Sequence, residues 1–198
     1  YDELDPERGW NVNLGGGIYV QEKLHLDAEV YWLQMRDEIT YVGTFPSGSN
    51  QNSDASRRLG GEIGGSWDVF SLLSLEAGYS FVDAVFIDGE YEGGTIPQVS
   101  KHSADATAAL QLPGGVSAGG AVEIRSGYYP GGDFANEQGP EDARVIPDLF
   151  VRFSNERLAA SLEIANLLDT VYSPRTSWSE FGRLAYYPAP GRTLRLSL

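Results

Sequence analysis

The sequence predicts an all-β protein built as an antiparallel transmembrane β-barrel, and three observations support this prediction. Apolar and polar residues alternate in nine separate stretches of about ten residues, the period of a strand with one apolar face. Short turns and long loops alternate between these stretches, as they do in membrane barrels. The 24 glycines are spread along the 198 residues, and no stretch shows the period of a helix.

Each expected strand carries apolar residues at every second position. In the second strand Leu24, Leu26, Ala28, Val30 and Trp32 alternate with His25, Asp27, Glu29 and Tyr31. The same pattern recurs from the first strand to the last, so we expect two distinct faces throughout the sheet. The nine strands are expected at 10–20, 24–32, 59–69, 73–81, 101–112, 116–125, 145–153, 158–164 and 193–198.

The connections between the expected strands fall into two classes. Tight turns are expected at 21–23, 70–72, 113–114 and 155–156. Long loops rich in Gly, Pro, Ser and Asn are expected at 40–56, 86–100, 127–143 and 169–187. The apolar face would then meet lipid, and the polar face would line the lumen of a closed barrel. A soluble β-sandwich also has strands with one apolar face, and it stays open as an alternative.

Aromatic residues near the expected strand ends favour the membrane, because Tyr and Trp concentrate at membrane–water interfaces. These residues are Tyr41, Phe81, Tyr128, Tyr129, Tyr172, Tyr186 and Tyr187. The formal charge of −14 disfavours nucleic acid as a partner, since phosphates would be repelled. The chain has no cysteine, which excludes disulfides and thiolate metal sites. No signal peptide begins the chain, and no apolar run reaches the length of a membrane helix.

Catalysis finds little support in the sequence, and neither a metal site nor a cofactor is expected. His25 and His102 lie on different strands without the spacing of metal ligands. His102 beside Ser100 and Ser103 raises the alternative of a phospholipase, but no third partner is identifiable. The clusters at 15–17 and 60–61 lack the following helix of a phosphate loop, so their glycines are assigned to bends of the barrel wall.

Four motifs in order along the chain resemble a known family. Leu4-Asp5-Pro6-Glu7 opens the first strand, and Ile96-Pro97 precedes a later one. Asn166-Leu167-Leu168-Asp169, followed by Tyr172, ends the penultimate strand, and Pro190-Gly191-Arg192 begins the last. Together they resemble the barrel of TonB-dependent outer-membrane receptors. Asn166 and Asp169 are expected to bond the backbone as it leaves the membrane, with Tyr172 at the level of the lipid head groups.

The resemblance implies a particular place in a larger protein. Residues 1–198 would form the C-terminal nine strands of a barrel of about 22 strands, without the plug and roughly the first thirteen strands. Leu198 departs from the aromatic residue that usually ends the family. The implied partners are the rest of the barrel, the plug, the TonB system acting through the plug, and outer-membrane lipid. The implied location is the outer membrane of a Gram-negative bacterium.

The function implied by the resemblance is TonB-dependent import of a scarce, bulky nutrient, such as a metal chelate, a siderophore or a cobalamin-like molecule. A passive porin-like channel stays open as an alternative. Charges on the polar face, such as Glu29 and Asp105, would face either the plug or a water-filled lumen. In residues 1–9 and the four long loops, acidic residues outnumber basic ones by fourteen to three. Such a rim would favour neutral or cationic ligands, or bind divalent cations that bridge to lipopolysaccharide.

Ligand contact is expected in the long loops, because recognition from outside cannot use the tight turns. Loops 127–143 and 169–187 combine aromatic residues with two of the few loop arginines. Aromatic rings cover a bulky ligand at low entropic cost, and arginine suits any anionic group on it. A girdle of interfacial aromatics and solvated arginines is the alternative for the same residues. The expected ligand residues are Tyr128, Tyr129, Phe134, Arg175, Trp178, Phe181 and Arg183.

Overall fold

A computed structural model describes residues 4–42, 48–70, 72–179 and 182–198. Its described residues form strands and irregular segments. The strands are β1 (Arg8–Val20), β2 (Leu24–Arg36), β3 (Ile39–Val42), β4 (Ser49–Asn52), β5 (Ser56–Val69), β6 (Leu73–Phe86), β7 (His102–Leu112), β8 (Val116–Arg125), β9 (Arg144–Ser154), β10 (Ala159–Ala165), β11 (Arg175–Ser179), β12 (Arg183–Tyr187) and β13 (Thr193–Ser197).

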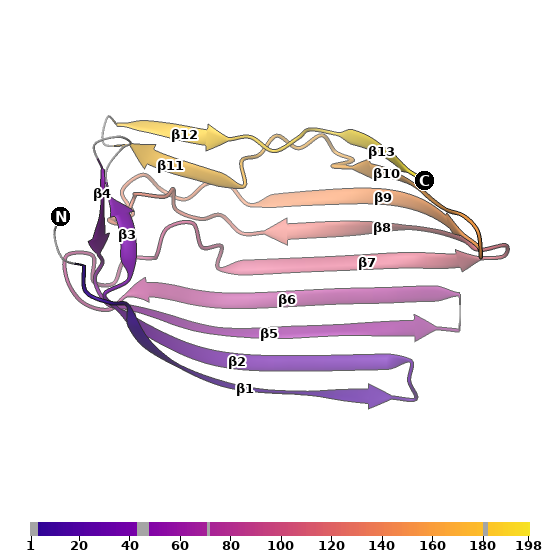
Figure 1. Cartoon of the computed structure of the whole chain (residues 1–198), viewed down its shortest axis with the longest axis horizontal. Helices are drawn as coiled ribbons and strands as arrows, with labels where there is room; N and C mark the ends of the chain where they lie inside the picture. The colour runs from indigo at the N-terminus through magenta and orange to yellow at the C-terminus, as the bar shows by residue number, and fades with distance from the viewer. Residues whose placement is uncertain (1–3, 43–47, 71, 180–181) are drawn as a thin grey trace.

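Nine of these strands form one antiparallel sheet, in the order β1-β2-β5-β6-β7-β8-β9-β10-β13. Strands that follow one another in the sheet are also neighbours in sequence, apart from the two inserted hairpins (Figure 1). The short connections lie together at one end of the sheet, here called the turn end. The long connections lie at the other, here called the loop end (Figure 1). This arrangement confirms the all-β antiparallel fold and the nine strands expected from the alternation.

Cross-strand pairing places apolar residues opposite apolar residues. Leu14 lies opposite Val30, and Ile63 lies opposite both Ala28 and Tyr79. Because side chains alternate between faces, this register puts the whole apolar set on one side. These side chains are exposed, as the 75% exposure of Leu14 and the 58% exposure of Val30 illustrate. One face of the sheet is therefore apolar and unpacked, which suits contact with lipid.

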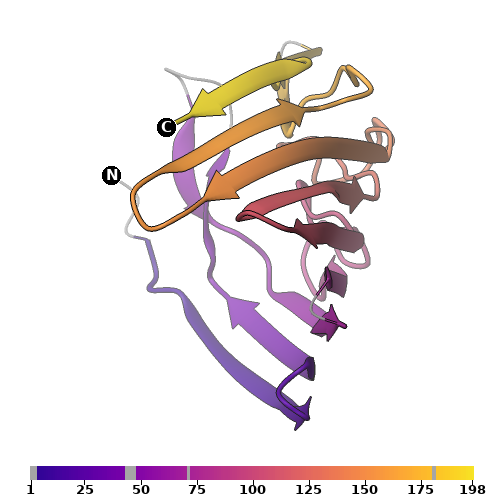
Figure 2. The ribbon, with the colours of Figure 1, turned by 90° about the vertical axis from the view of Figure 1, so that its right-hand side faces the viewer.

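The sheet is strongly curved, so that viewed nearly along its strands it forms an open arc (Figure 2). The polar positions line its inner face, where Asp105, Glu123, Asp148 and Arg195 border a shared cavity. Buried apolar side chains are few and include Phe86, Tyr128, Ile146 and Phe150. All nine long strands belong to one sheet, which excludes the β-sandwich alternative, in which two sheets pack face to face.

The structure differs from the expected strand boundaries mainly at the loop end. Strand β2 continues past its expected end to Arg36, and β6 continues to Phe86. Strand β5 begins earlier than expected, at Ser56. Two expected loops contain hairpins of their own, β3–β4 and β11–β12. Each of their strands has only four or five residues, such as Ser49-Asn50-Gln51-Asn52, which is too short for an alternation that would mark a strand. Among the described residues, no helix is long and apolar enough to span a membrane.

Candidate functional site

A loop-end cavity of about 550 Å³ lies where five separate segments of the chain converge. Hairpin β3–β4, the end of β6, the loops 87–101 and 126–143, and strand β11 all contribute to its walls. Five aromatic side chains and three charged ones line it. They are Tyr41, Phe86, Tyr91, Phe134 and Trp178, with Glu38, Arg58 and Arg175.

Glu38 and Arg58 form the polar side of this cavity. The Arg58 Nη2 donates to Glu38 Oε1 at 2.9 Å, and Nη1 lies 3.3 Å from Glu38 Oε2. The fully buried Ser56 donates its hydroxyl to the same carboxylate and accepts from Arg58 Nη1. Both charged side chains are three-quarters or more buried. A two-pronged contact of this kind holds the guanidinium in a defined orientation toward the cavity.

Three aromatic rings from different segments form a second wall. Phe86 at the end of β6 lies 6.0 Å from Tyr91 and 6.0 Å from Phe134, and the latter two are 5.5 Å apart, measured between ring centroids. Rings at these separations attract one another beyond their buried area. Burial raises the pKa of the Tyr91 phenol, and the neighbouring Glu90 and Asp54 carboxylates raise it further. Tyr91 is therefore uncharged at neutral pH and presents a hydroxyl.

Backbone and side-chain hydrogen bonds hold the loops around the cavity together. Gly131 and β11 exchange two backbone bonds: Gly131 N donates to Thr176 O, and Trp178 N donates to Gly131 O. The Gln98 side chain also donates to Thr176 O, at 3.0 Å. These contacts join residues up to 78 positions apart in the sequence. Trp178 and the loop 126–143 are thus held in fixed relation to each other.

In the loop 126–143, Asn136 joins this loop to Thr95 in the loop 87–101, and Asp133 closes the loop upon itself. The Asn136 side chain accepts from Thr95 N at 2.6 Å and donates to Thr95 O at 2.9 Å. Asp133 is 4% exposed and accepts from the backbone of Glu137 and Gln138. Such contacts satisfy loop backbone groups that would otherwise need water. These side chains therefore support the cavity wall from within the loops.

The structure brings three of the seven expected ligand residues to this cavity, namely Phe134, Arg175 and Trp178. The Tyr128 ring is 4% exposed, and its hydroxyl donates to Ser173 O at 2.8 Å, so it joins two loops. Tyr129 and the exposed Arg183 are not among the residues that line the cavity. Phe181 lies outside the described residues.

The motif Asn166-Leu167-Leu168-Asp169 forms a clasp at the end of β10. The Asn166 Oδ1 accepts from Thr170 N at 2.8 Å, and its Nδ2 donates to Thr170 O at 2.9 Å. The Asp169 Oδ1 accepts from Arg192 N at 2.7 Å, which joins the motif to the start of β13. Asn166 and Asp169 have φ of 52° and 55°, a conformation that Asn and Asp tolerate better than most residues. The expected bonds from both side chains to the backbone are therefore present.

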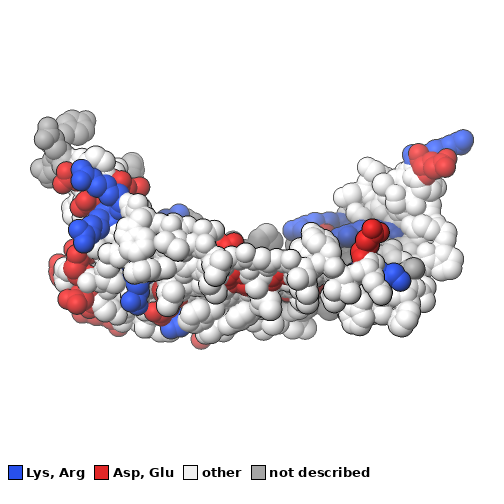
Figure 3. Space-filling model, turned by 90° about the horizontal axis from the view of Figure 1, so that it is seen from below, with Lys and Arg blue, Asp and Glu red and all other residues white. Residues whose placement is uncertain are grey.

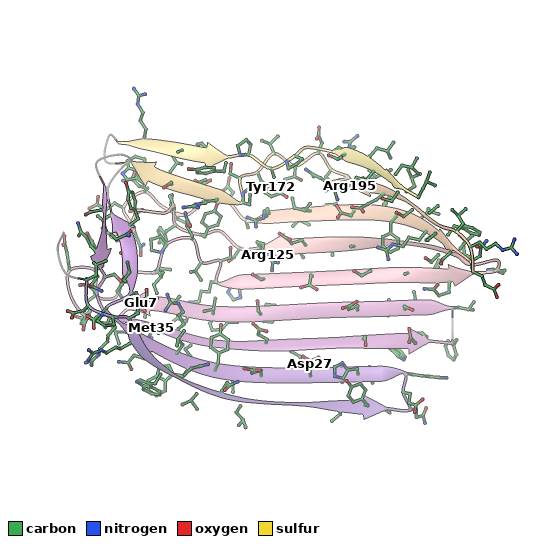
Figure 4. The ribbon with its side chains drawn as sticks, viewed as in Figure 1. Glu7, Asp27, Met35, Arg125, Tyr172 and Arg195 are labelled. Atoms are coloured by element: carbon green, nitrogen blue, oxygen red, sulfur yellow. The ribbon has the colours of Figure 1, made fainter. Side chains whose placement is uncertain are left out.

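Tyr172 is oriented toward the inner side of the sheet. Its ring lies 5.2 Å from the Arg144 guanidinium, in cation–π geometry, and it borders an inner cavity of about 290 Å³ (Figure 4). Asn166, Pro190 and Gly191 border the same cavity. Tyr172 thus faces the inner side of the sheet and not the lipid, while its place at the level of the lipid head groups stays a prediction. The attraction of Arg144 for the aromatic ring accounts for this orientation.

Charged residues on the inner face divide into two groups. In the C-terminal half, Glu123 lies near both Arg125 and Arg144, and Arg195 pairs with Glu163 at 3.0 Å. In the N-terminal half, Glu29 lies directly opposite Glu62 in the register, and Asn13 donates to Glu29. Within the described residues no group of three or more His, Cys, Asp or Glu is arranged to hold a metal ion.

Several residues of the loop-end cavity are not among the expected ligand residues, namely Glu38, Arg58, Phe86 and Tyr91. Their positions depend on how β3 and the loop 87–101 fold over the strand ends. The clustering of aromatic residues in the loops was the one sequence signal that pointed to this region.

Comparison with known proteins agrees with this architecture. A family profile described as "TonB dependent receptor-like, beta-barrel" matches residues 1–167. No curated protein sequence matches the chain.

Similar solved structures include the ferric-catecholate import receptor Fiu of E. coli K12, with 20% identity and a TM-score of 0.75 over 98% of this chain and 27% of that one. The siderophore receptor PiuA of Acinetobacter baumannii has 21% identity and a TM-score of 0.77, over 98% of this chain and 28% of that one. The ferric yersiniabactin uptake receptor FyuA of Yersinia pestis has 18% identity and a TM-score of 0.79, over 95% of this chain and 29% of that one. The chain therefore spans less than a third of the length of these three proteins.

Proposed function

The chain belongs to the family of TonB-dependent receptors, and we propose that it forms the C-terminal part of such a receptor in the outer membrane of a Gram-negative bacterium. In this proposal the nine-stranded sheet is part of a barrel of about 22 strands. The loop end faces the outside and the turn end faces the periplasm, as in other outer-membrane barrels. A plug fills the lumen and couples import to the TonB system.

The proposed activity is the energised import of a scarce, bulky organic nutrient, such as a metal chelate or a cobalamin-like molecule. The observation that carries this proposal is the loop-end cavity of about 550 Å³, a volume typical of sites for organic ligands. Its walls combine aromatic faces with a few oriented polar groups, the composition expected of a site for a small molecule. A barrel that only admits ions and water has no need of such a wall.

The charges at the cavity restrict the class of ligand. Glu38 and Arg58 neutralise each other, and Arg175 adds one positive charge. The surrounding loop segments are strongly acidic. We therefore propose a ligand that is neutral or carries a small negative charge, with Arg175 meeting any anionic group and Phe134 and Trp178 covering apolar surface.

The inner wall suits the plug as its partner. Glu29 and Glu62 face each other across β2 and β5, and like charges in this position repel. Positive side chains on the plug would relieve this repulsion. We propose that this part of the wall meets a basic surface of the plug. Strands β8, β9 and β13 carry Arg125, Arg144 and Arg195 beside their acidic residues, and we propose that they meet a less basic surface.

Whole-cell ligand binding by the full-length receptor tests the proposed site. Trp178→Ala and Arg175→Ala should each weaken binding by about tenfold, the usual loss when a central contact is truncated. Leu168→Ala, an exposed loop substitution away from the cavity, is the control. Surface expression must be equal in all strains. Unchanged affinity in both cavity variants would exclude the loop-end cavity as the binding site.

A further inference from the structure

Four basic residues lie on the apolar face of the sheet, at its loop end. Parity along the strands places Arg8 with Trp10 on β1, Arg36 with Trp32 on β2, and Arg57 with Leu59 on β5, all on the lipid-facing side. Lys101 reaches the same side, because its Nζ lies over the Phe81 ring. We call Arg8, Arg36, Arg57 and Lys101 the basic belt.

Among the described residues, Asp83 is the carboxylate that forms ion pairs with members of the basic belt. Asp83 lies 2.8 Å from Lys101 Nζ and 3.6 Å from Arg57 Nη2, so it aligns two members of the belt. Arg8 and Arg36 are direct cross-strand partners, both exposed, and neither forms an ion pair with any residue that the structure describes. Together they border a groove of about 350 Å³. Like charges that face each other repel, so an anion bound between them would stabilise this pair.

Aromatic side chains mark the depth of the belt in the membrane. Trp10 and Trp32 pack edge to face with ring centroids 4.5 Å apart, and both are exposed on the lipid-facing side. Tryptophan occupies the boundary between acyl chains and head groups. Arg8 is two residues beyond Trp10, about 7 Å further toward the loops at the rise of a strand. The belt therefore lies at the level of the phosphates of the outer leaflet.

The spacing of the belt indicates the kind of head group. Arg8, Arg36 and Arg57 come from β1, β2 and β5. Lys101 directly precedes β7, and its ammonium group reaches Asp83 on β6, so the four charges lie over four consecutive strands of the sheet. Three intervals between neighbouring strands amount to about 14 Å. A single phosphate occupies only a fraction of this width. A glycolipid head group that carries two phosphates spans enough of it to meet both the Arg8–Arg36 pair and the Arg57–Lys101 pair.

We propose that the basic belt binds the phosphates of a diphosphorylated glycolipid of the outer leaflet and so fixes this side of the barrel in the membrane. This inference rests on the proposed orientation, in which the loop end faces outward. Figure 3 shows basic side chains at the loop end with acidic ones beside them, and further basic side chains at the turn end. The contact is direct, between guanidinium or ammonium groups and phosphate oxygens, and it requires no bridging metal ion.

The test uses the full-length receptor in detergent micelles and measures its affinity for diphosphoryl lipid A. The unaltered receptor should bind diphosphoryl lipid A at least tenfold more tightly than the same lipid without phosphates. The double variant Arg36→Gln, Lys101→Gln should lose most of this difference. The control Lys23→Gln, Arg157→Gln removes the same charge from the turn end and should keep it.

Three outcomes would overturn the proposal. The first is equal binding of the phosphorylated and dephosphorylated lipids by the unaltered receptor. This comparison needs no variant, so it tests the proposal even if the double variant fails to assemble. The second is equal loss in the control. The third is displacement of the lipid by millimolar inorganic phosphate, which would identify a site for free phosphate. Nutrient binding that persists in the double variant would show that the proposed import function stands independently.

Discussion

Arg58 on β5 and Glu38, the residue before β3, form an ion pair that fastens the β3–β4 hairpin to the sheet. The two side chains meet at 2.9 Å between Nη2 and Oε1, with Ser56 bound to both. The pair lies at the border of the loop-end cavity, so it both shapes the cavity and positions a hairpin that alternation did not predict.

Replacing Arg58 with Met should loosen the β3–β4 hairpin without unfolding the barrel. Glu38 would then be a mostly buried carboxylate without its charge partner, which costs more than the loss of an exposed pair. We expect hydrogen exchange at the amides of Ile39–Val42 to accelerate by about tenfold or more. Arg157→Met, which removes an exposed arginine from a tight turn, should leave these amides unchanged. Equal exchange in both variants would contradict the role given to the ion pair.

Replacing Asn166 with Ala should destabilise the junction of β10 and β13. The change removes the side-chain bonds to Thr170 and leaves Ala in a left-handed conformation that it adopts poorly. We expect a loss of about 2–3 kcal/mol, measured as the free energy of unfolding of the full-length protein in detergent. Leu168→Ala in the same motif, at a residue 64% exposed, should cost about 0.5 kcal/mol or less. Similar losses in both variants would argue against the clasp.

An arginine on the lipid-facing side should block assembly, whereas one on the inner side should be tolerated. Val30 is 58% exposed on the apolar face, and a charge at the bilayer midplane there costs about 2–4 kcal/mol. Val30→Arg should therefore reduce the amount of folded receptor in the outer membrane, as judged by its resistance to unfolding in cold detergent. Glu29→Arg, on the adjacent inner position, is the matched comparison. Equal tolerance of the two substitutions would count against the assignment of the faces.

The contribution of Tyr91 to the stability of the folded protein should depend on pH. Its pKa is raised in the folded protein, first by burial and then by Glu90 and Asp54. The folded state thus holds the phenolic proton more tightly than the unfolded state, whose pKa is near 10. This contribution is fully present below about pH 10 and is lost as the pH rises through the raised pKa. Absorbance titration of tyrosinate, compared with Tyr91→Phe, should show one phenol fewer among those that titrate late.

The sequence alone determined which residues form the long strands and which face each of them presents. Alternation is a local property, because the side chains of a strand point to opposite sides whatever the strand pairs with. Leu14, Val30 and Ile63 therefore could be assigned to one apolar face before any pairing was known, and the register confirms that assignment. The nine strands and their antiparallel order followed from the same local signal and from the lengths of the connections.

Other features were decided only by the tertiary structure, because they depend on contacts between residues far apart in the chain. Gln98 reaches Thr176 across 78 positions, and Glu38 meets Arg58 through a hairpin whose sequence does not alternate. The sequence placed Phe134, Arg175 and Trp178 in the long loops, but only the packing of these loops brings the three side chains to one cavity. The same packing buries Tyr128, whose hydroxyl joins two loops. Tyr172 contacts Arg144 at the start of β9, and sequence spacing does not reveal this contact. Local periodicity determines which residues lie on each face of a strand. Contacts between distant loops determine which residues line the loop-end cavity.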